Sequence, residues 1–111
     1  AAAEPVPELG YDPAIDVVVP RFHGLSPFSG TELEHLLRNE GITTVVLAGV
    51  SLNVAIPNAA FDLVNGGFQA VVATDCVVAT PPEYGGQVLA NTLSYVATLV
   101  GSSELAAAWQ G

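Results

Sequence analysis

Hydrophobic positions along the chain fall into continuous apolar runs, typical of buried strands, and into helical spacings between those runs. The runs at Thr43–Gly49 and Phe68–Ala73 are rich in β-branched residues and predict strands that are buried on both faces. A shorter run at Ile15–Val19 is closed by Pro20, which cannot donate to a sheet ladder, so it predicts an edge or terminal strand. Residues Val96–Val100 predict a last short strand.

Four segments have the spacing of amphipathic helices. The predicted helices are Thr31 to about Asn39, Ile56–Val64, Gln87 to about Tyr95, and a terminal helix that Ser102 or Ser103 caps and that ends at Trp109. In the first helix, Thr31 and Glu34 have the spacing of a capping box, and Gly41 is the expected C-cap. Its buried face is predicted to consist of Leu33, Leu36 and Leu37. The segment Thr74–Tyr84 contains two prolines and is predicted to be a loop.

The alternation of strands and helices predicts an α/β fold, a three-layer α/β/α Rossmann-like domain with a parallel sheet. Such sheets usually have about five or more strands, and the sequence offers about four. We therefore expect the chain to be the C-terminal part of a larger α/β domain whose first strand is not in this chain. Residues 1–13 hold three prolines and no apolar period, so we expect an extended arm or linker there, with the domain at 14–111.

The charge of the chain excludes several classes of partner. Eleven acidic residues against two arginines and no lysine give a formal net charge of −9, so the surface repels phosphate. We therefore expect no nucleic acid and no membrane partner. The lone cysteine, Cys76, cannot form an internal disulfide, and the N-terminus has no signal-peptide pattern, so we expect a cytoplasmic location.

In an open parallel sheet, ligands bind at the carboxyl ends of the strands, which places the expected site in the loops Gly49–Ile56 and Thr74–Tyr84. We expect Asp75 to fix its loop by accepting backbone N–H groups, with acid–base chemistry as the alternative. Cys76 is expected to be a buried, inert thiol, and a relocated nucleophile is the alternative.

Two motifs carry a resemblance to a known family. The box Ser26-Pro27-Phe28-Ser29-Gly30-Thr31, followed by Gly49-Val50-Ser51-Leu52-Asn53-Val54, resembles the isochorismatase-like cysteine hydrolases, which include nicotinamidases and related amidases. The resemblance covers about residues 14–109. It implies a catalytic triad: an aspartate on the first strand, a lysine at the end of a later strand, and a cysteine nucleophile at the start of a helix.

The sequence departs from that triad at each position. Ala55 stands at the cysteine position, directly after the second motif, and a methyl group cannot attack a carbonyl. The lysine position lies near residues 20–22, where only Arg21 is basic, and its guanidinium stays protonated. The aspartate strand would precede Ala1.

The resemblance also implies a pocket beside the lost nucleophile. The Val50–Ser51 peptide is commonly a non-proline cis bond that helps to shape an oxyanion hole, and we predict the same bond here. His23 and Phe28 are candidate pocket residues, with a surface or packing role as the alternative. Asn53 is predicted to be at or near the N-cap of the helix that starts at Ile56, with a pocket role second.

Neither a metal nor another cofactor is expected. Zinc-binding nicotinamidases use an Asp-x-His-x-His cluster, as the family implies, and this spacing does not occur in the sequence.

Three functional hypotheses remain open, and the sequence does not decide whether the chain is an enzyme. The first is a family member that has lost the cysteine mechanism and retains a small-molecule pocket or an assembly role. The second is an active hydrolase of amide, C–N or related bonds that uses noncanonical groups. The third is a structural subunit of an oligomer. We expect a homo-oligomer or a partner chain that completes the sheet.

Overall fold

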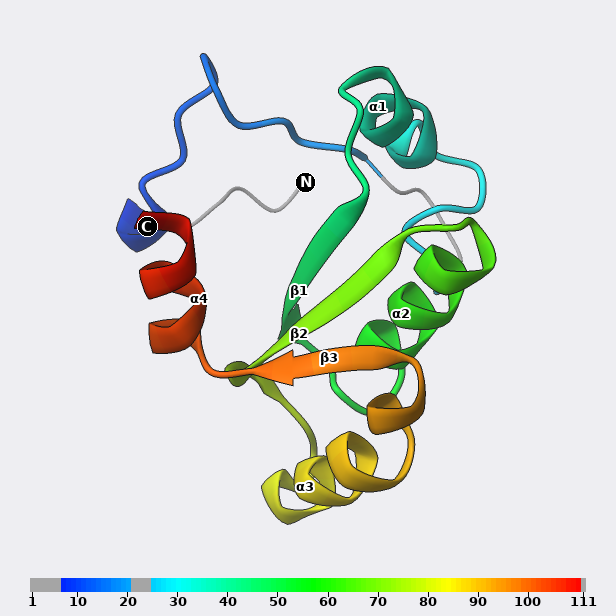
Figure 1. The fold of residues 1–111 in the computed structure, drawn as a ribbon, viewed down its shortest axis with the longest axis vertical. Helices are drawn as coiled ribbons and strands as arrows, with labels where there is room; N and C mark the ends of the chain where they lie inside the picture. The colour runs from blue at the N-terminus through cyan, green and yellow to red at the C-terminus, as the bar shows by residue number, and fades with distance from the viewer. Residues whose placement is uncertain (1–6, 21–24, 111) are drawn as a thin grey trace.

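The computed structural model describes residues 7–20 and 25–110, which form helices and strands that alternate after residue 30 (Figure 1). The elements in chain order are η1 (Pro7–Leu9), α1 (Leu33–Asn39), β1 (Thr44–Val50), α2 (Ala55–Asn65), β2 (Gln69–Val78), α3 (Pro82–Asn91), η2 (Leu93–Tyr95), β3 (Ala97–Val100) and α4 (Ser102–Gln110). Across these described residues, each helix is too short or too polar to cross a lipid bilayer.

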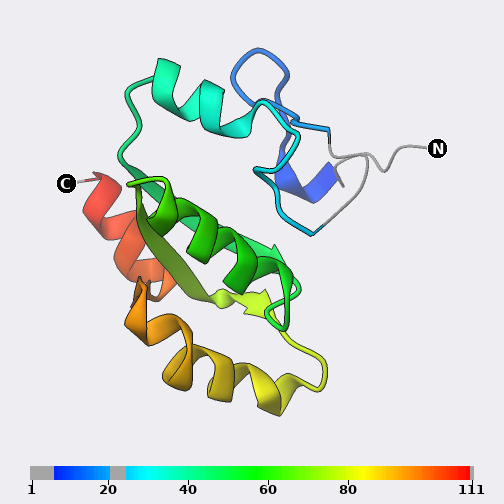
Figure 2. The same ribbon diagram turned by 90° about the vertical axis from the view of Figure 1, so that its right-hand side faces the viewer.

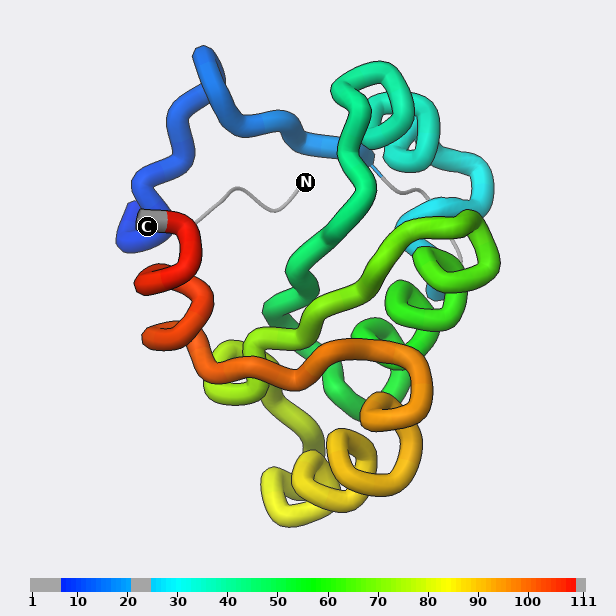
Figure 3. Tube along the Cα trace, in the orientation of Figure 1, coloured from blue at the N-terminus to red at the C-terminus, as the bar shows by residue number. Residues whose placement is uncertain are grey.

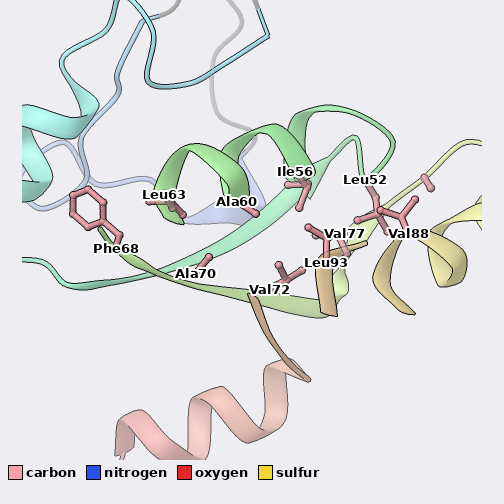
Figure 4. Packing of buried hydrophobic residues seen from close by; sticks show 11 residues of the cluster. Leu52, Ile56, Ala60, Leu63, Phe68, Ala70, Val72, Val77, Val88 and Leu93 are labelled. Carbon is pink, nitrogen blue, oxygen red and sulfur yellow. The ribbon is translucent and has the colours of Figure 1, made fainter. Parts of the chain in front are cut away.

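A parallel sheet in the order β1-β2-β3 forms the middle layer of the fold. Helix α2 connects β1 to β2 and covers one face of the sheet, whereas α4 lies on the other face (Figures 2 and 4). The predicted α/β architecture with a parallel sheet is therefore confirmed. Strand β1 has one neighbour, β2, and its other edge is unpaired among the described residues. Completion of the sheet by a second copy or a partner chain stays a prediction.

Helix α2 forms because its apolar positions return to one face every three or four residues. The side chains of Ile56, Ala59, Ala60 and Leu63 are all buried, as the spacing predicts. Two alanines in the middle of this face let the helix axis approach the strands closely. Pro57 lies in the first turn, where its missing N–H leaves no helical hydrogen bond unmade.

The hydrophobic core lies between α2, β2 and α3 (Figure 4). Its centre consists of four fully buried side chains, Leu52, Leu63, Val72 and Leu93. These residues come from the β1–α2 turn, from α2, from β2 and from η2, so one cluster joins both crossover connections of the sheet.

Strand β1 lies where the apolar run predicts it, but it is not buried on both faces. Val45, Val46 and Leu47 are half-buried, and the remaining residues of the strand are exposed. The reason is its position at the edge of the sheet: among the described residues, β2 lies along one side of β1 and its other side has no neighbouring strand. The prediction of a doubly buried strand is correct for β2, in which Ala70, Val72 and Ala73 are buried.

The prediction of a strand at Ile15–Val19 is wrong. A turn takes up the start of the run, because the carbonyl of Asp12 accepts the N–H groups of Ile15 at 3.0 Å and Asp16 at 2.7 Å. The Asp16 carboxylate accepts the Asp12 N–H in return, at 2.9 Å. Val17 and Val18 continue without a sheet partner and are exposed. The sheet thus has three strands in the described residues, rather than about four.

Helix α1 has its N-cap at Glu32, one residue later than the capping box predicts. The Thr31 hydroxyl accepts the Leu33 N–H at 3.3 Å, but it also donates to the carbonyls of the preceding turn, so Thr31 closes that turn. Glu34 pairs with Arg38 at 3.0 Å instead of returning to Thr31. The predicted end near Asn39 is confirmed, but the C-cap is Glu40; Gly41 follows it with φ +70°, and its N–H donates to the Arg38 carbonyl at 3.1 Å.

The segment Thr74–Tyr84 is a loop only in its middle, because β2 runs on to Val78 and α3 begins at Pro82. Proline suits the first helical position, where no backbone donor is needed. Gly85 lies inside α3 because a side chain there would collide with Leu52, whose Cδ2 lies 3.0 Å from the ideal Cβ position. Two glycines and two prolines weaken the helical signal, which explains the late predicted start at Gln87.

A large bulge interrupts β2 where it passes β1. Leu47 pairs with Val72 and Gly49 with Val77, so four residues of β2, 73–76, lie opposite one residue of β1. Gly49 takes φ +118° at this point, a backbone conformation that favours glycine. Figure 3 shows the chain of β2 curling beside the start of α4.

The bulge brings Asp75 to the first residue of α4. Its carboxylate accepts the backbone N–H of Ser102 at 2.8 Å and the Ser102 hydroxyl at 2.5 Å. Asp75 therefore fixes a backbone N–H group, as expected, and it caps α4 in place of the predicted serine. The hydroxyl and then the N–H of Ser102 hold the pKa of Asp75 below its usual value. Cys76 is exposed in the same bulge, so the prediction of a buried thiol is wrong.

We expect Asp75→Ala to destabilise the protein near neutral pH and to matter less in acid. A carboxyl group whose pKa is lowered by folding stabilises the fold above its unfolded pKa of about 3.9, and this contribution is lost as the pH falls through the folded value. Urea unfolding of the wild-type protein and of Asp75→Ala, at about pH 7 and about pH 3, measures the free energy of unfolding that the substitution removes at each pH. Ser103→Ala, at the adjacent exposed serine, is the control. Equal losses of unfolding free energy at both pH values would show that the charge of Asp75 does not contribute to stability.

Candidate functional site

A cavity of about 240 Å³ lies between β1, the first half of α2 and the loop around Phe28. Its wall is formed by Pro27, Phe28, Leu33, Val45, Leu47, Ala48, Val50, Ala55, Ile56 and Ala59. Every one of these side chains is apolar. The cavity thus joins three of the residues that the sequence singles out for a pocket, Phe28, Val50 and Ala55.

Ala55 is the first residue of α2 and is half-buried against the cavity. The N-terminal end of a helix carries partial positive charge, which would stabilise a thiolate at this position. A methyl group makes no use of that field, because it can neither ionise nor attack. The assignment of Ala55 to the family's nucleophile position stays a prediction.

The turn from β1 to α2 contains the predicted cis peptide bond, Val50–Ser51. Val50 lies at the rim of the cavity and is 74% exposed. The Ser51 carbonyl accepts the Ile56 N–H at 3.0 Å, which ties the turn to the first turn of α2. The next residue, Leu52, donates its N–H to the Val78 carbonyl at 2.7 Å, so the turn is also fixed to β2.

Asn53 lies directly before the N-cap of α2, near it as predicted, but its side chain does not cap the helix. The N-cap position belongs to Val54. The Asn53 amide instead donates to the Thr80 carbonyl and accepts the Thr80 N–H, both at 2.8 Å. This two-way pair fastens the β1–α2 turn to the β2–α3 loop, and Asn53 has no place in the cavity wall. A side chain that matches both backbone groups of a distant residue has no local signal in the sequence.

A hydrogen-bond network sets the position of Phe28. The Ser26 hydroxyl accepts the N–H groups of Phe28 at 3.0 Å and Ser29 at 3.1 Å, and it donates to the Asp62 carboxylate on α2. The hydroxyl therefore uses its donor and both acceptor sites at once. Asp62 anchors the Phe28 loop to the same helix that carries Ala55, a role that sequence reasoning missed. Ser26 belongs to the first motif that carries the family resemblance, which was the available signal.

Arg38 connects helix α1 to the turn that follows α2. Its guanidinium lies 4.7 Å from the centre of the Phe68 ring, donates to the Gly66 carbonyl at 2.6 Å and pairs with Glu34 at 3.0 Å. These contacts hold α1 against the turn that follows α2. Arg38 takes no part in the wall of the cavity.

Cys76, another candidate residue, does not join this cavity. Cys76 lies in the bulge of β2, where its sulfur is 3.9 Å from the Asp75 carboxylate. His23 and Arg21 lie outside the described residues. Within 7–20 and 25–110, His, Cys, Asp and Glu residues do not gather in threes at a distance that would hold a metal ion.

Known proteins of one family share both the sequence pattern and the fold of this chain. The profile of the Isochorismatase domain matches residues 1–104. The chain belongs to the isochorismatase family. It is 36% identical over 75 residues to the isochorismatase family protein YwoC of Bacillus subtilis, a match that covers 68% of this chain and 39% of YwoC.

Solved structures of isochorismatase-family proteins superpose well. An isochorismatase-like hydrolase from Alkaliphilus metalliredigens gives a TM-score of 0.85 at 30% identity, over 94% of this chain and 56% of that protein. Nicotinamidase PncA from Bacillus subtilis gives a TM-score of 0.64 at 32% identity, over 70% of this chain and 43% of PncA. The chain thus spans about two fifths to just over half of these isochorismatase-family relatives.

We expect Asp62→Ala to loosen the wall of the cavity in this isochorismatase-family protein. Without its acceptor, the Ser26 hydroxyl is no longer held to α2, and a lost hydrogen bond to a carboxylate costs about 1.5–3 kcal/mol. Hydrogen exchange of the Phe28 and Ser29 amides should therefore be at least about tenfold faster. Asn65→Ala, an exposed position on the same helix, should leave both rates unchanged. Unchanged exchange in Asp62→Ala would mean that the loop holds its position without Asp62.

Proposed function

We propose that this chain binds a small organic molecule in the cavity beside Ala55 and lacks the cysteine-dependent hydrolysis of its family. The observation that carries the proposal is the composition of the cavity wall. All ten side chains that line it among the described residues are apolar, so this part of the wall offers surface for binding and no group that can attack a carbonyl or transfer a proton.

The surroundings of Ala55 support a retained pocket. The Val50–Ser51 turn is tied to α2 and to β2, and the Ser26–Asp62 network holds the Phe28 loop in place. The cavity is therefore built by several independent contacts and does not depend on a nucleophile. This favours a binding role over a purely structural one.

The alternative is a hydrolase that uses a relocated thiol. Cys76 is the only cysteine in the sequence, and it lies in the β2 bulge, outside the cavity wall. Its near neighbour is the Asp75 carboxylate, which is already engaged by Ser102. An exposed thiol without a general base beside it is a poor candidate for catalysis.

Two measurements on the purified chain test the proposal. We expect ligand-observed NMR to detect binding of nicotinamide, and an ammonia assay to detect no hydrolysis, with the nicotinamidase PncA as the positive control. Isochorismate serves as a second test compound; it contains no nitrogen, so its hydrolysis is followed by the release of pyruvate. Hydrolysis that disappears in Cys76→Ala would establish a relocated thiol, and hydrolysis that survives it would establish another noncanonical mechanism. Either result overturns the proposal.

A gain of reactivity is expected when a thiol is placed at the start of α2. In a Cys76→Ala background, Ala55→Cys puts the single thiol at the positive end of the helix, which lowers the pKa of a thiol. Its alkylation by iodoacetamide at about pH 7 should be at least about tenfold faster than that of Asn65→Cys in the same background.

Asn65→Cys is the matched control because it lies at the opposite, negative end of the same helix and is exposed. Equal alkylation rates would show that the environment of Ala55 does not activate a thiol. In that case Ala55 would not occupy a nucleophile position, and the resemblance would mislead at this residue.

A further inference from the structure

Strand β3 forms one side of the sheet, and its outer edge is unpaired within residues 7–20 and 25–110. The N–H and C=O groups of such an edge can pair with another strand, and proteins usually protect it with a charged side chain, a proline or a bulge. Residues Ala97–Val100 contain neither a charge nor a proline, and they pair with β2 in an unbroken register. The described structure thus leaves β3 open to a further strand.

The carboxylates of this acidic chain are concentrated away from β3. The stretch 84–103, which forms most of α3 and all of η2 and β3, contains no charged side chain. Strand β1 is uncharged too, but six of the eleven acidic residues lie within 7–20 and 32–40, on the β1 side of the sheet (Figures 1 and 2). Two copies of a chain with a net charge of −9 therefore repel each other least when they meet at β3.

The remaining charges near β3 favour one direction of pairing. Glu104 in the first turn of α4 and Asp75, which accepts the Ser102 N–H, both lie at the carboxyl end of the strand. The amino end follows η2, which is uncharged. Parallel pairing of two β3 strands would bring the carboxylates of both copies together, whereas antiparallel pairing places each carboxyl end beside the η2 of the other copy. Antiparallel pairing therefore separates the like charges.

Tyr95 adds an exposed aromatic ring next to this edge. It lies in η2, two residues before β3, and is 84% exposed, more than any other large hydrophobic side chain of the described residues. Tyrosine is enriched in protein interfaces, and a buried aromatic ring removes about 150–250 Å² from water. Two such rings, one from each copy, would extend the contact well beyond a ladder of four residues.

We propose that β3 is a dimerisation edge, where a second copy of this chain pairs antiparallel with β3 across a two-fold axis. The same strand then meets itself in the partner, as a two-fold interface requires. The result is one continuous sheet with three strands from each copy. This surface is separate from the cavity beside Ala55, so dimerisation does not depend on ligand binding there.

Sedimentation equilibrium of the purified chain tests for the dimer. Between about 10 μM and about 1 mM protein we expect a concentration-dependent equilibrium of monomer and dimer. The dimer should tighten when the salt concentration rises from about 0.05 M to about 0.5 M, because salt screens the repulsion between two acidic copies and an uncharged ladder loses nothing. A monomer at every concentration, or a dimer that weakens in salt, would overturn the proposal.

A matched pair of glutamate substitutions locates the interface. Thr98 is the exposed residue of β3, and Thr98→Glu places a negative charge on both strands of the ladder, so we expect the dimer to dissociate at least about tenfold more readily. Thr44→Glu makes the same change at an exposed residue of β1, the other edge strand, and should leave the dissociation constant unchanged. Equal weakening by both variants would assign the effect to net charge, and weakening by Thr44→Glu alone would place the interface at β1. Either result contradicts the proposal.

Hydrogen exchange of the wild-type chain distinguishes strand pairing from other contacts between two copies. The N–H groups of Ala97–Val100 that do not donate to β2 gain acceptors in the dimer. Their exchange should therefore be at least about tenfold slower at a protein concentration that favours the dimer than at one that favours the monomer. The amides of β1 should exchange at the same rate at both concentrations. A dimer that protects β1 or α4 and leaves β3 unchanged would overturn the proposal.

Discussion

The packing of α2 on β1 and β2 is the contact on which the other features depend. Its buried face, with Ala60 and Leu63 fully buried, fixes the helix against the sheet. That placement sets Ala55 at the cavity, Asp62 under the Phe28 loop and Gly66 within reach of Arg38. One helix thus places Ala55 at the cavity, the anchor of the cavity wall and, at the residue that follows it, the attachment of α1.

The periodicity of the sequence was sufficient for the elements that pack strongly. The α2 spacing and the apolar runs of β1, β2 and β3 predict these elements because burial of one face or of a whole strand decides them. The Ile15–Val19 run misleads for the same reason: β-branched residues favour a strand only where a neighbour supplies a ladder, and the Asp12 turn takes the first residues away.

The polar details of the site could not be predicted from local pattern. Asn53 resembles a helix cap in the sequence, yet Thr80 offers it two hydrogen bonds that no neighbour in the chain can match. The contact between Asp75 and Ser102 could not be predicted either, because a bulge of β2 brings these two residues together. The cis bond and the placement of Phe28 at a pocket came from the family resemblance. Tertiary contacts between residues far apart in the chain decide all of these.

Three side-chain clasps between distant residues, Arg38–Gly66, Asn53–Thr80 and Asp75–Ser102, span almost the same length of chain. The separations are 28, 27 and 27 residues. The entropy lost on closing a loop grows only with the logarithm of its length, so each clasp closes at nearly the same entropic cost. Each of these contacts also links one strand–helix unit of the fold to the unit that follows it in the chain. Removal of any one of the three would therefore return a similar amount of chain entropy, and in this respect no one of them outweighs the others.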